Sequence, residues 1–437
     1  MTTTLISFII VLGVLIFIHE LGHFAVAKLG GVGVEKFSLG FGPRLAGVKT
    51  KETDYMVSLV PLGGYVKMVG GDFGEEQTDP ADRHRSFIHK PIYIRVLIVA
   101  AGPFMNLALA LFLLPLIFMI GVPVPAFLGA PAFVGYVTPK GAAAKAGIKA
   151  GDVIASIDGE KIKDWEGVMT APAFSAGKLY RLTVLRGSSA LNLTVTPAVR
   201  EDAYAGYAGI LPPMPPVIGE VTKGNPAKEA GIIAGDEITM IDGVPISHWA
   251  ELEAHIQKDG GRKKTFTVKR EGKAMDIVLA PKFDKDADKY IVGIIRKEET
   301  VKRFYGFFEG VDKGVKSAVN MTGQLFVVIK GLFTGKFSLK TLGGPIQIAQ
   351  VAGKAAQTGL SQFLTLVAFL SLQLGIINLF PIPVLDGGHI LFFAIEAVKG
   401  SPLSEKFMSI AQQVGVALIV ILMALVTYND ITRVFFR

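Results

Sequence analysis

Three ionisable side chains interrupt an apolar run near the start of the chain. Between Leu5 and Ala27, the only ionisable residues are His19, Glu20 and His23. Residues four apart lie on one face of a helix, so the two imidazoles of H-E-L-G-H can bind one Zn²⁺ ion. Glu20 lies beside them and is suited to take a proton from water at the metal. The pattern therefore predicts a zinc site with a carboxylate base.

The apolar surroundings decide how this short pattern is interpreted. In a soluble helix, H-E-x-x-H arises often by chance, and two polar packing histidines beside a carboxylate are the alternative. Ionisable groups in a bilayer cost several kcal/mol and are usually functional. Burying three such groups in one apolar run without a ligand would gain nothing, so zinc binding is favoured.

A third ligand is expected in another apolar run. Catalytic zinc sites use three protein ligands and keep one position for water, and the chain has no cysteine. The stretch N-L-F-P-I-P-V-L-D-G-G-H, from Asn378 to His389, places Asp386 after two prolines and before two glycines. A helix broken at membrane depth must be buried or line a wet cavity. Asp386 is the predicted third ligand of one Zn²⁺ per chain, and His389 is the rival.

Four apolar runs are long enough to cross roughly 30 Å of hydrocarbon. The composition agrees, since half of the residues are hydrophobic. Basic residues are dense between the first two runs, so the positive-inside rule places both termini outside. A fifth segment, Met321–Thr334, is predicted to be an interfacial amphipathic segment, and the later topology would invert if it crossed. The four predicted spans are Leu5–Ala27, Val96–Val122, Leu360–Leu385 and Phe407–Tyr428.

The polar region between spans two and three contains a repeat. Ala143–Ile162 and Ala227–Ile246 share five glycine and aspartate positions at a constant offset of 84 residues. Each copy predicts a short helix stopped by glycine, an A-G-D turn, a strand and an I-D-G hairpin turn. Alternating segments at Tyr180–Val184 and Thr265–Lys269 predict further strands. The two copies resemble tandem PDZ domains, which bind extended peptides at a sheet edge. Their alternative role is to pack against the membrane part or to block access to it.

Together, these motifs resemble the site-2 protease family of intramembrane zinc metalloproteases. The four-span layout with tandem PDZ domains resembles the bacterial RseP-type branch of that family, and the resemblance covers essentially the whole chain. It implies His19, His23 and Asp386 as zinc ligands and Glu20 as the catalytic base. It implies that Asn378 contacts the substrate backbone. A-G-P-F-M-N, ending at Asn106, matches a second-span motif, although the sequence does not identify the partner of Asn106.

The resemblance also assigns a role to Tyr55–Gly70, which predicts two strands that turn at Pro61–Gly64. In the family this is a re-entrant β-hairpin that offers an edge to an unwound substrate. The alternative is a cytoplasmic hairpin packed on the domain. The implied substrate-binding residues of this edge are Leu62, Gly63, Gly64 and Tyr65.

The expected protein is thus a polytopic α-helical membrane protein with a re-entrant β-hairpin and two inserted α+β PDZ domains. Its implied substrates are single-span membrane proteins such as a trimmed anti-sigma factor in an envelope-stress pathway, and remnant signal peptides. The implied location is the bacterial inner membrane, with both termini and the PDZ domains on the periplasmic side. The expected divisions are 1–126 (spans one and two), 127–210 and 211–298 (PDZ domains), 299–358 (membrane surface) and 359–437 (spans three and four).

Two other classes of function compete with a protease. One is a catalytically idle PDZ scaffold in the membrane, and the other is a metal transporter that uses the same ligands. The presence of both Glu20 and Asp386 disfavours an inactive scaffold. A metal transporter would need neither a glutamate beside the ligands nor two peptide-binding modules. The net charge of +8 indicates basic loops at the lipid bilayer, because no stretch combines dense Lys/Arg with stacking aromatics. A nucleic-acid partner is therefore not expected.

Overall fold

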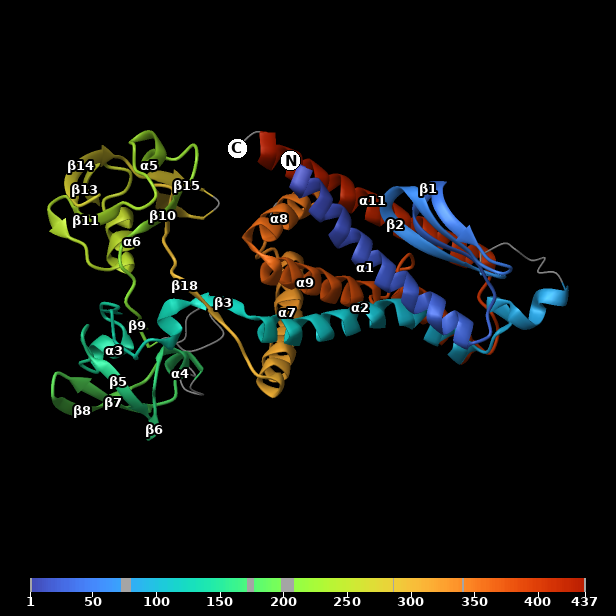
Figure 1. Ribbon diagram of the computed structural model, residues 1–437, viewed down its shortest axis with the longest axis horizontal. Helices are drawn as coiled ribbons and strands as arrows, with labels where there is room; N and C mark the ends of the chain where they lie inside the picture. Colours follow the sequence, from blue (N-terminus) through green and yellow to red (C-terminus); the bar gives the residue numbers. More distant parts are fainter. Residues whose placement is uncertain are drawn as a thin grey trace. The chain divides into compact units, whose positions relative to one another are not determined.

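The protein consists of two compact units, one inserted into the other. The computed structural model describes residues 2–71, 80–170, 177–197, 208–285, 287–339 and 342–435. Unit 1 comprises Met1–Val122 and Arg303–Arg437, and unit 2 comprises Pro123–Lys302 (Figure 1). The chain therefore leaves unit 1 after the second long helix and returns to it before the third.

In the described part of unit 1, four helices are long and apolar enough to cross a membrane. Their positions confirm the four predicted apolar runs, with one difference. The third run was expected to continue to Leu385, but its helix stops at Asn378, and Asp386 begins a separate helix, α10 (Asp386–Lys399). Two prolines between these helices remove the amide donors that a continuous helix would need. The four helices are α1 (Thr2–Leu29), α2 (Ile92–Ile120), α9 (Leu360–Asn378) and α11 (Glu405–Phe435).

Helix α2 is the centre of unit 1, because it packs against α1 and α9 (Figure 1). Small residues let these helices approach closely. A Cβ on Gly22 would lie 2.4 Å from the carbonyl oxygen of Ala101, and one on Gly375 would lie 2.9 Å from that of Pro103. Close approach at small residues is how helices associate where water provides no hydrophobic driving force between them. The site residues of α1 are thereby held against α2.

The amphipathic segment expected at Met321–Thr334 is part of a much longer helix, α7 (Phe307–Phe333), which crosses α2 in Figure 1. It is not among the four membrane-crossing candidates of the described chain. Gly310, Gly314 and Ala318 recur every four residues and are buried, and a Cβ on Gly314 would lie 2.6 Å from Pro115 in α2. The first half of α7 also carries four charged residues, which explains why hydropathy located only its second half: Glu309, Asp312, Lys313 and Lys316.

A shorter helix, α8 (Pro345–Thr358), packs against α1 and α11 in unit 1. Asp430 of α11 is buried and accepts hydrogen bonds from the backbone amides of Gly344 and Gln347 at 3.0 Å each. These amides belong to the first turn of α8, where intrahelical partners are lacking. A side chain from a distant helix therefore caps α8.

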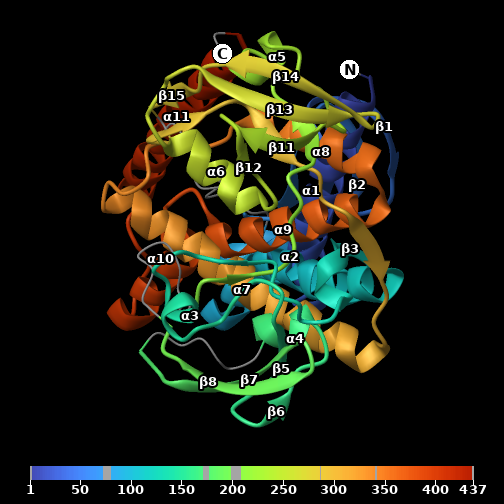
Figure 2. The same cartoon turned by 90° about the vertical axis from the view of Figure 1, so that its left-hand side faces the viewer.

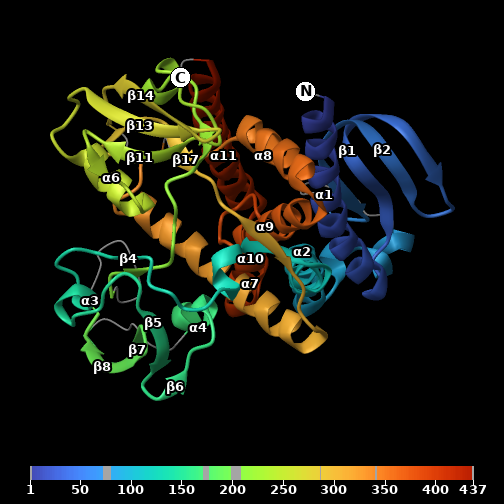
Figure 3. The same cartoon turned by 60° about the vertical axis from the view of Figure 1, so that its left-hand side comes forward.

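Beside α1, the strands β1 (Val34–Lys49) and β2 (Asp54–Met68) form a folded sheet (Figure 3). Residues 36–39 of β1 pair with residues 54–57 of β2 on one side, and residues 34–39 pair with 64–68 on the other. Residues 44–49 of β1 pair with 54–58. Both arms of the predicted hairpin are thus strand, but each pairs with β1 and not with the other arm. Among the described strands, residues 64–68 pair only with β1 and form an outer edge of this sheet.

Unit 2 contains two four-stranded sheets of matching order, and the strands expected from the repeat are present (Figure 2). The orders are β6-β5-β7-β8 and β12-β11-β13-β14, and each sheet has its own core. The first sheet contains β5 (Val153–Ile157), β6 (Glu160–Lys161), β7 (Tyr180–Arg186) and β8 (Ser189–Val195), with helices α3 (Ala142–Lys145) and α4 (Trp165–Thr170). The second contains β11 (Glu237–Ile241), β12 (Val244–Pro245), β13 (Lys264–Arg270) and β14 (Lys273–Leu279), with α5 (Pro226–Glu229) and α6 (Trp249–Gln257).

Short strand pairs complete unit 2. They are β4 (Tyr136–Val137) with β9 (Ile210–Leu211), β10 (Ile218–Val221) with β17 (Ile294–Arg296), β15 (Lys282–Asp284) with β16 (Lys289–Ile291), and β3 (Val122–Pro125) with β18 (Thr300–Arg303).

The repeated A-G-D aspartates are buried and hold arginines at the same offset. Asp152 binds Arg186 through two bonds of 2.7 and 2.9 Å, and Asp236 binds Arg270 through two bonds of 2.7 Å. The hydrogen bonds from Arg186 hold the pKa of Asp152 below its ordinary value. Burial opposes the charge of Asp236, but bonds from Arg270 and the Ile233 amide outweigh it and lower its pKa. Each repeat thus locks its turn to a strand by one charge-assisted fork.

Candidate metal centre

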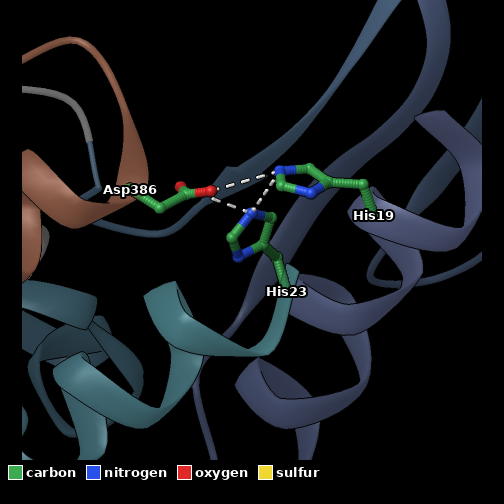
Figure 4. Close-up of side chains that lie close together, drawn as sticks. All are labelled: His19, His23 and Asp386. Atoms are coloured by element: carbon green, nitrogen blue, oxygen red, sulfur yellow. Dashed lines mark hydrogen bonds and ion pairs between the residues drawn. The ribbon is translucent and has the colours of Figure 1, made fainter. Parts of the chain in front are cut away.

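Three side chains from two distant helices meet at one point in unit 1. His19 and His23 project from one face of α1, and Asp386 projects toward them from the start of α10 (Figure 4). The two Nε2 atoms are 3.2 Å apart. Asp386 places Oδ2 3.3 Å from Nε2 of His19 and Oδ1 3.6 Å from Nε2 of His23. Among the described residues, this is the one cluster of three His, Cys, Asp or Glu side chains that could hold a metal ion.

The separations within this cluster fit zinc. Zinc lies about 2.0–2.1 Å from nitrogen and oxygen ligands, so neighbouring ligands of a tetrahedral site are about 3.3–3.4 Å apart. The observed separations of 3.2, 3.3 and 3.6 Å lie close to this value. The donor set of two imidazoles and a carboxylate is also typical of catalytic zinc, and it leaves the fourth position for a substrate or water.

Asp386 reaches the cluster because the chain folds back tightly after α9. A Cβ on Gly387 would lie 2.2 Å from the carbonyl oxygen of Leu379, and one on Gly388 would lie 2.2 Å from that of Ile382. The two glycines therefore let the first turn of α10 press against the preceding bend. The carboxylate of Asp386 sits in that first turn, where the helix dipole favours a negative charge.

Helix α2 forms the floor beneath both imidazoles. Nδ1 of His23 is 2.9 Å from the carbonyl oxygen of Ile98, and Nδ1 of His19 is 3.2 Å from Nδ2 of Asn106. Between them, a Cβ on Gly102 would lie 2.3 Å from Nε2 of His23 and 2.9 Å from Cε1 of His19. Only a glycine at this position lets both rings lie this close to α2. Contacts of this kind to the second ring nitrogen orient a ligating histidine.

Glu20 lies between the cluster and the β1–β2 sheet. It is close enough to interact electrostatically with both His23 and Asp386. A Cβ on Gly64 would lie 2.9 Å from Cγ of Glu20 and 2.8 Å from the side chain of Ile16. The outer strand of the sheet therefore reaches α1 at the level of Glu20, and glycine is what permits this approach.

The other residues of the predicted hairpin edge also lie in β2. Tyr65 stacks on the ring of Phe41 with centroids 6.2 Å apart, and Gly63 packs against the same ring. For Leu62, only the backbone is described, and it belongs to β2. The hairpin edge is thus anchored on Phe41 as well as on α1.

Two predicted residues lie outside the three-residue cluster. Asn378 is the last residue of α9 and is half-buried, eight positions before Asp386. His389 is half-buried in α10, where its ring packs edge-on against Phe392. Of the two candidates for the third position, the structure brings Asp386 and not His389 into the cluster.

Sequence reasoning missed the contribution of the α2 backbone. The carbonyl of Ile98 carries no sequence signal, because every residue has one. Gly102 lies within the motif A-G-P-F-M-N, but that motif does not indicate that the neighbours of Gly102 are the two imidazoles. One face of α2 carries Ile98, Gly102 and Asn106, because these residues are spaced four apart. The spacing could be linked to the site only after α1 was placed against that face.

Comparisons with known proteins identify the family to which the chain is similar. The model of the peptidase family M50 matches residues 7–422. The regulator of sigma-E protease RseP of Escherichia coli is 37% identical over 449 residues, and the alignment covers 98% of each chain. The regulator of sigma E protease of Salmonella typhi is 38% identical over 456 residues, again with 98% of each chain covered. A Neisseria meningitidis protein whose name classes it as a zinc metalloprotease is 35% identical, with 98% of this chain and 99% of that protein covered.

Among solved structures, the PDZ domain of an SdrC-like protein from Listeria innocua is 27% identical and covers 20% of this chain and 96% of that domain, with a TM-score of 0.18.

Proposed function

Because the chain belongs to the peptidase family M50, we propose that the cluster of His19, His23 and Asp386 is the zinc centre of a protease that acts inside the membrane. The chain is a zinc metalloprotease, like the relatives described above, and it is a membrane protein. The observation that carries the proposal for these residues is their ligand separation, which fits a tetrahedral zinc site. One Zn²⁺ per chain is proposed.

The chemistry follows from the residues around this centre. When bound, Zn²⁺ would supply the Lewis acidity that amide hydrolysis needs. Glu20 lies next to the ligands and acts as general base, taking the proton from the attacking water. It then delivers that proton to the leaving amine. His19, His23 and Asp386 hold the metal, and the α2 floor keeps the two imidazoles in place.

Substrate presentation is proposed for the outer strand of β2. A peptide bond inside a transmembrane helix is already hydrogen-bonded, so the substrate must be unwound before water can attack. Residues 64–68 form an outer edge near Glu20, and main-chain bonds along such an edge hold a peptide extended without selecting side chains. Leu62, Gly63, Gly64 and Tyr65 are the proposed contacts. Asn378 is proposed to bind the substrate backbone from the end of α9.

The proposed substrates are single-span membrane proteins already trimmed outside the membrane. The relatives are named as regulators of sigma E, which supports an anti-sigma factor as substrate in an envelope-stress response, and remnant signal peptides fit the same chemistry. The proposed setting is the bacterial inner membrane with both termini on the periplasmic side. The repeats of unit 2, over 127–210 and 211–298, are proposed to be two periplasmic PDZ domains.

A groove in the second repeat supports peptide binding there. It has a volume of about 710 Å³ and lies between α6 and residues 288–294. At one end, Gln257 of α6 donates to the carbonyl of Tyr290 and accepts from its amide, at 2.8 and 2.9 Å. Gln257 thus occupies main-chain groups of Tyr290 that an added strand would use. An extended peptide that entered between α6 and this strand, as PDZ ligands do, would displace Gln257 from Tyr290.

The decisive experiment compares the intact protein with Glu20→Gln and Asp386→Ala. Each purified form is assayed for bound zinc and for cleavage of a single-span model substrate in vesicles. Glu20→Gln should keep zinc and lose cleavage, whereas Asp386→Ala should lose both. Glu309→Gln, which alters an exposed carboxylate of α7, is the matched control and should behave like the native protein.

Other outcomes would overturn the proposal. A scaffold would cleave nothing in any form, and a transporter would move zinc across the vesicle without proteolysis. Full activity of Glu20→Gln would remove the proposed base, and full zinc content of Asp386→Ala would remove the proposed ligand.

A further inference from the structure

One buried amide next to the proposed zinc centre lacks a hydrogen bond that its burial demands. Asn106 in α2 is 0% exposed. Its Nδ2 lies 3.2 Å from Nδ1 of His19, while its Oδ1 is buried and makes no hydrogen bond within the described structure. A buried polar group without a partner costs free energy, so an unpaired acceptor beside a ring nitrogen calls for an explanation.

The chemistry of a ligating imidazole supplies one. A ring nitrogen binds a metal through its lone pair, so the proton of the neutral ring must sit on the other nitrogen. Both Nε2 atoms face the point where the ligands converge (Figure 4). In the zinc-binding form, both Nδ1 atoms therefore carry a proton and need an acceptor.

The two histidines meet this need in different ways. Nδ1 of His23 faces the carbonyl oxygen of Ile98 at 2.9 Å, which can only accept. Nδ1 of His19 faces a side-chain amide, which can present either its oxygen or its nitrogen. The tautomer of His23 is thus fixed by the main chain, whereas that of His19 depends on which atom of Asn106 it meets.

Asn106 is held in place from a third helix. Oγ of Ser371 in α9 is fully buried and donates to the main-chain oxygen of Asn106 at 2.8 Å. This contact fixes the backbone beneath His19 and engages neither atom of the side-chain amide. Rotation by half a turn would exchange Nδ2 for the unpaired Oδ1.

We propose that Asn106 is a positioning residue for the zinc centre. Its Oδ1 accepts the proton on Nδ1 of His19 and so holds the tautomer in which Nε2 is available to the metal. This inference rests on the proposed function, because it assumes that His19 ligates zinc through Nε2. Loss of such an outer contact typically lowers metal affinity by about 10- to 100-fold.

The test measures zinc affinity of the full-length protein in detergent by competition with a chelator. Asn106→Leu has a similar volume and no acceptor, and should bind zinc about 10- to 100-fold more weakly. Asn106→Asp can only accept, and should bind within a few-fold of the native protein. Thr365→Val is the matched control, because it removes a side-chain hydrogen bond of α9, from Thr365 to the main-chain oxygen of Ser361, that involves neither Asn106 nor an imidazole. It should also bind zinc like the native protein.

Two further readouts separate positioning from folding. The melting temperature of each zinc-free variant reports the fold, and the absorption spectrum of the cobalt-substituted protein reports ligand geometry. The proposal predicts a changed cobalt spectrum for Asn106→Leu and a native-like one for Asn106→Asp. Should Asn106→Leu fail to fold, the comparison of Asn106→Asp with the native protein still decides.

Each contrary result has its own meaning. Native affinity in Asn106→Leu, or an equally weak affinity in Asn106→Asp, would show that Oδ1 does not set the tautomer while leaving the zinc centre intact. Failure of the native protein itself to bind zinc would overturn the proposed function and this inference with it.

Discussion

Replacing Gly102 by alanine tests whether α2 is the floor of the zinc centre. The added Cβ would lie 2.3 Å from Nε2 and 2.6 Å from Cε1 of His23, where ordinary contacts are 3.4–4 Å. The ring must therefore retreat by about 1 Å, a displacement that typically costs ~100-fold in function. It cannot do so freely, because its Nδ1 is bonded to the carbonyl oxygen of Ile98 at 2.9 Å.

The expected loss is large in metal binding and small in folding. Zinc–ligand distances are held within about 0.2 Å, so a 1 Å shift removes His23 as an effective ligand. We expect zinc affinity to fall by ~100-fold, which corresponds to about 2.7 kcal/mol. Alanine is also the better helix former by about 1 kcal/mol, so α2 itself should not be weakened.

The assay is chelator competition on the purified full-length protein, with thermal unfolding of the zinc-free form measured in parallel. Gly13→Ala in α1 is the matched control, because its added Cβ meets nothing within 4 Å. Gly13→Ala should match the native protein in zinc affinity. If Gly102→Ala bound zinc within about three-fold of the native protein, the imidazoles would not be pinned between α1 and α2, and the geometry argued for the site would be wrong.

Three other perturbations test the frame of the protein. Arg95 of α2 and Glu396 of α10 form a bidentate ion pair at 2.6 and 3.2 Å, with side chains 11% and 15% exposed. Arg95→Glu should destabilise unit 1 by about 3 kcal/mol. Adding Glu396→Arg should restore most of the lost stability, as measured by thermal unfolding. Because Arg186 holds the pKa of Asp152 low, this pair stabilises unit 2 above the ordinary carboxyl pKa, and that stability should be lost as pH falls below about 4. Tryptophan fluorescence of the intact protein can follow this loss, since both tryptophans lie in unit 2, and Arg186→Ala should flatten the pH dependence. Asp430→Ala should lower stability by about 1–2 kcal/mol through loss of the α8 cap, and an unchanged melting temperature would contradict the capping role.

Local patterns in the sequence predicted much of the frame. The four apolar runs became four long helices because a continuous apolar stretch of that length has one stable form in a bilayer. The 84-residue repeat became two sheets of the same strand order, since glycine and aspartate turns set the hairpins locally. Hydropathy did not locate the first half of α7, because charged residues lie beside the small residues that pack on α2 at Pro115.

The sequence by itself determined that His19 and His23 share one helix face with Glu20 between them, because that follows from 3.6 residues per turn. Only the tertiary structure decided that Asp386, and not His389, completes the cluster, since this depends on the fold-back at Gly387 and Gly388. It also decided the partner of Asn106, which required α1 and α2 to be placed against each other. Spacing along a helix is fixed by local bonds, whereas contacts between helices depend on packing that no short stretch of sequence encodes.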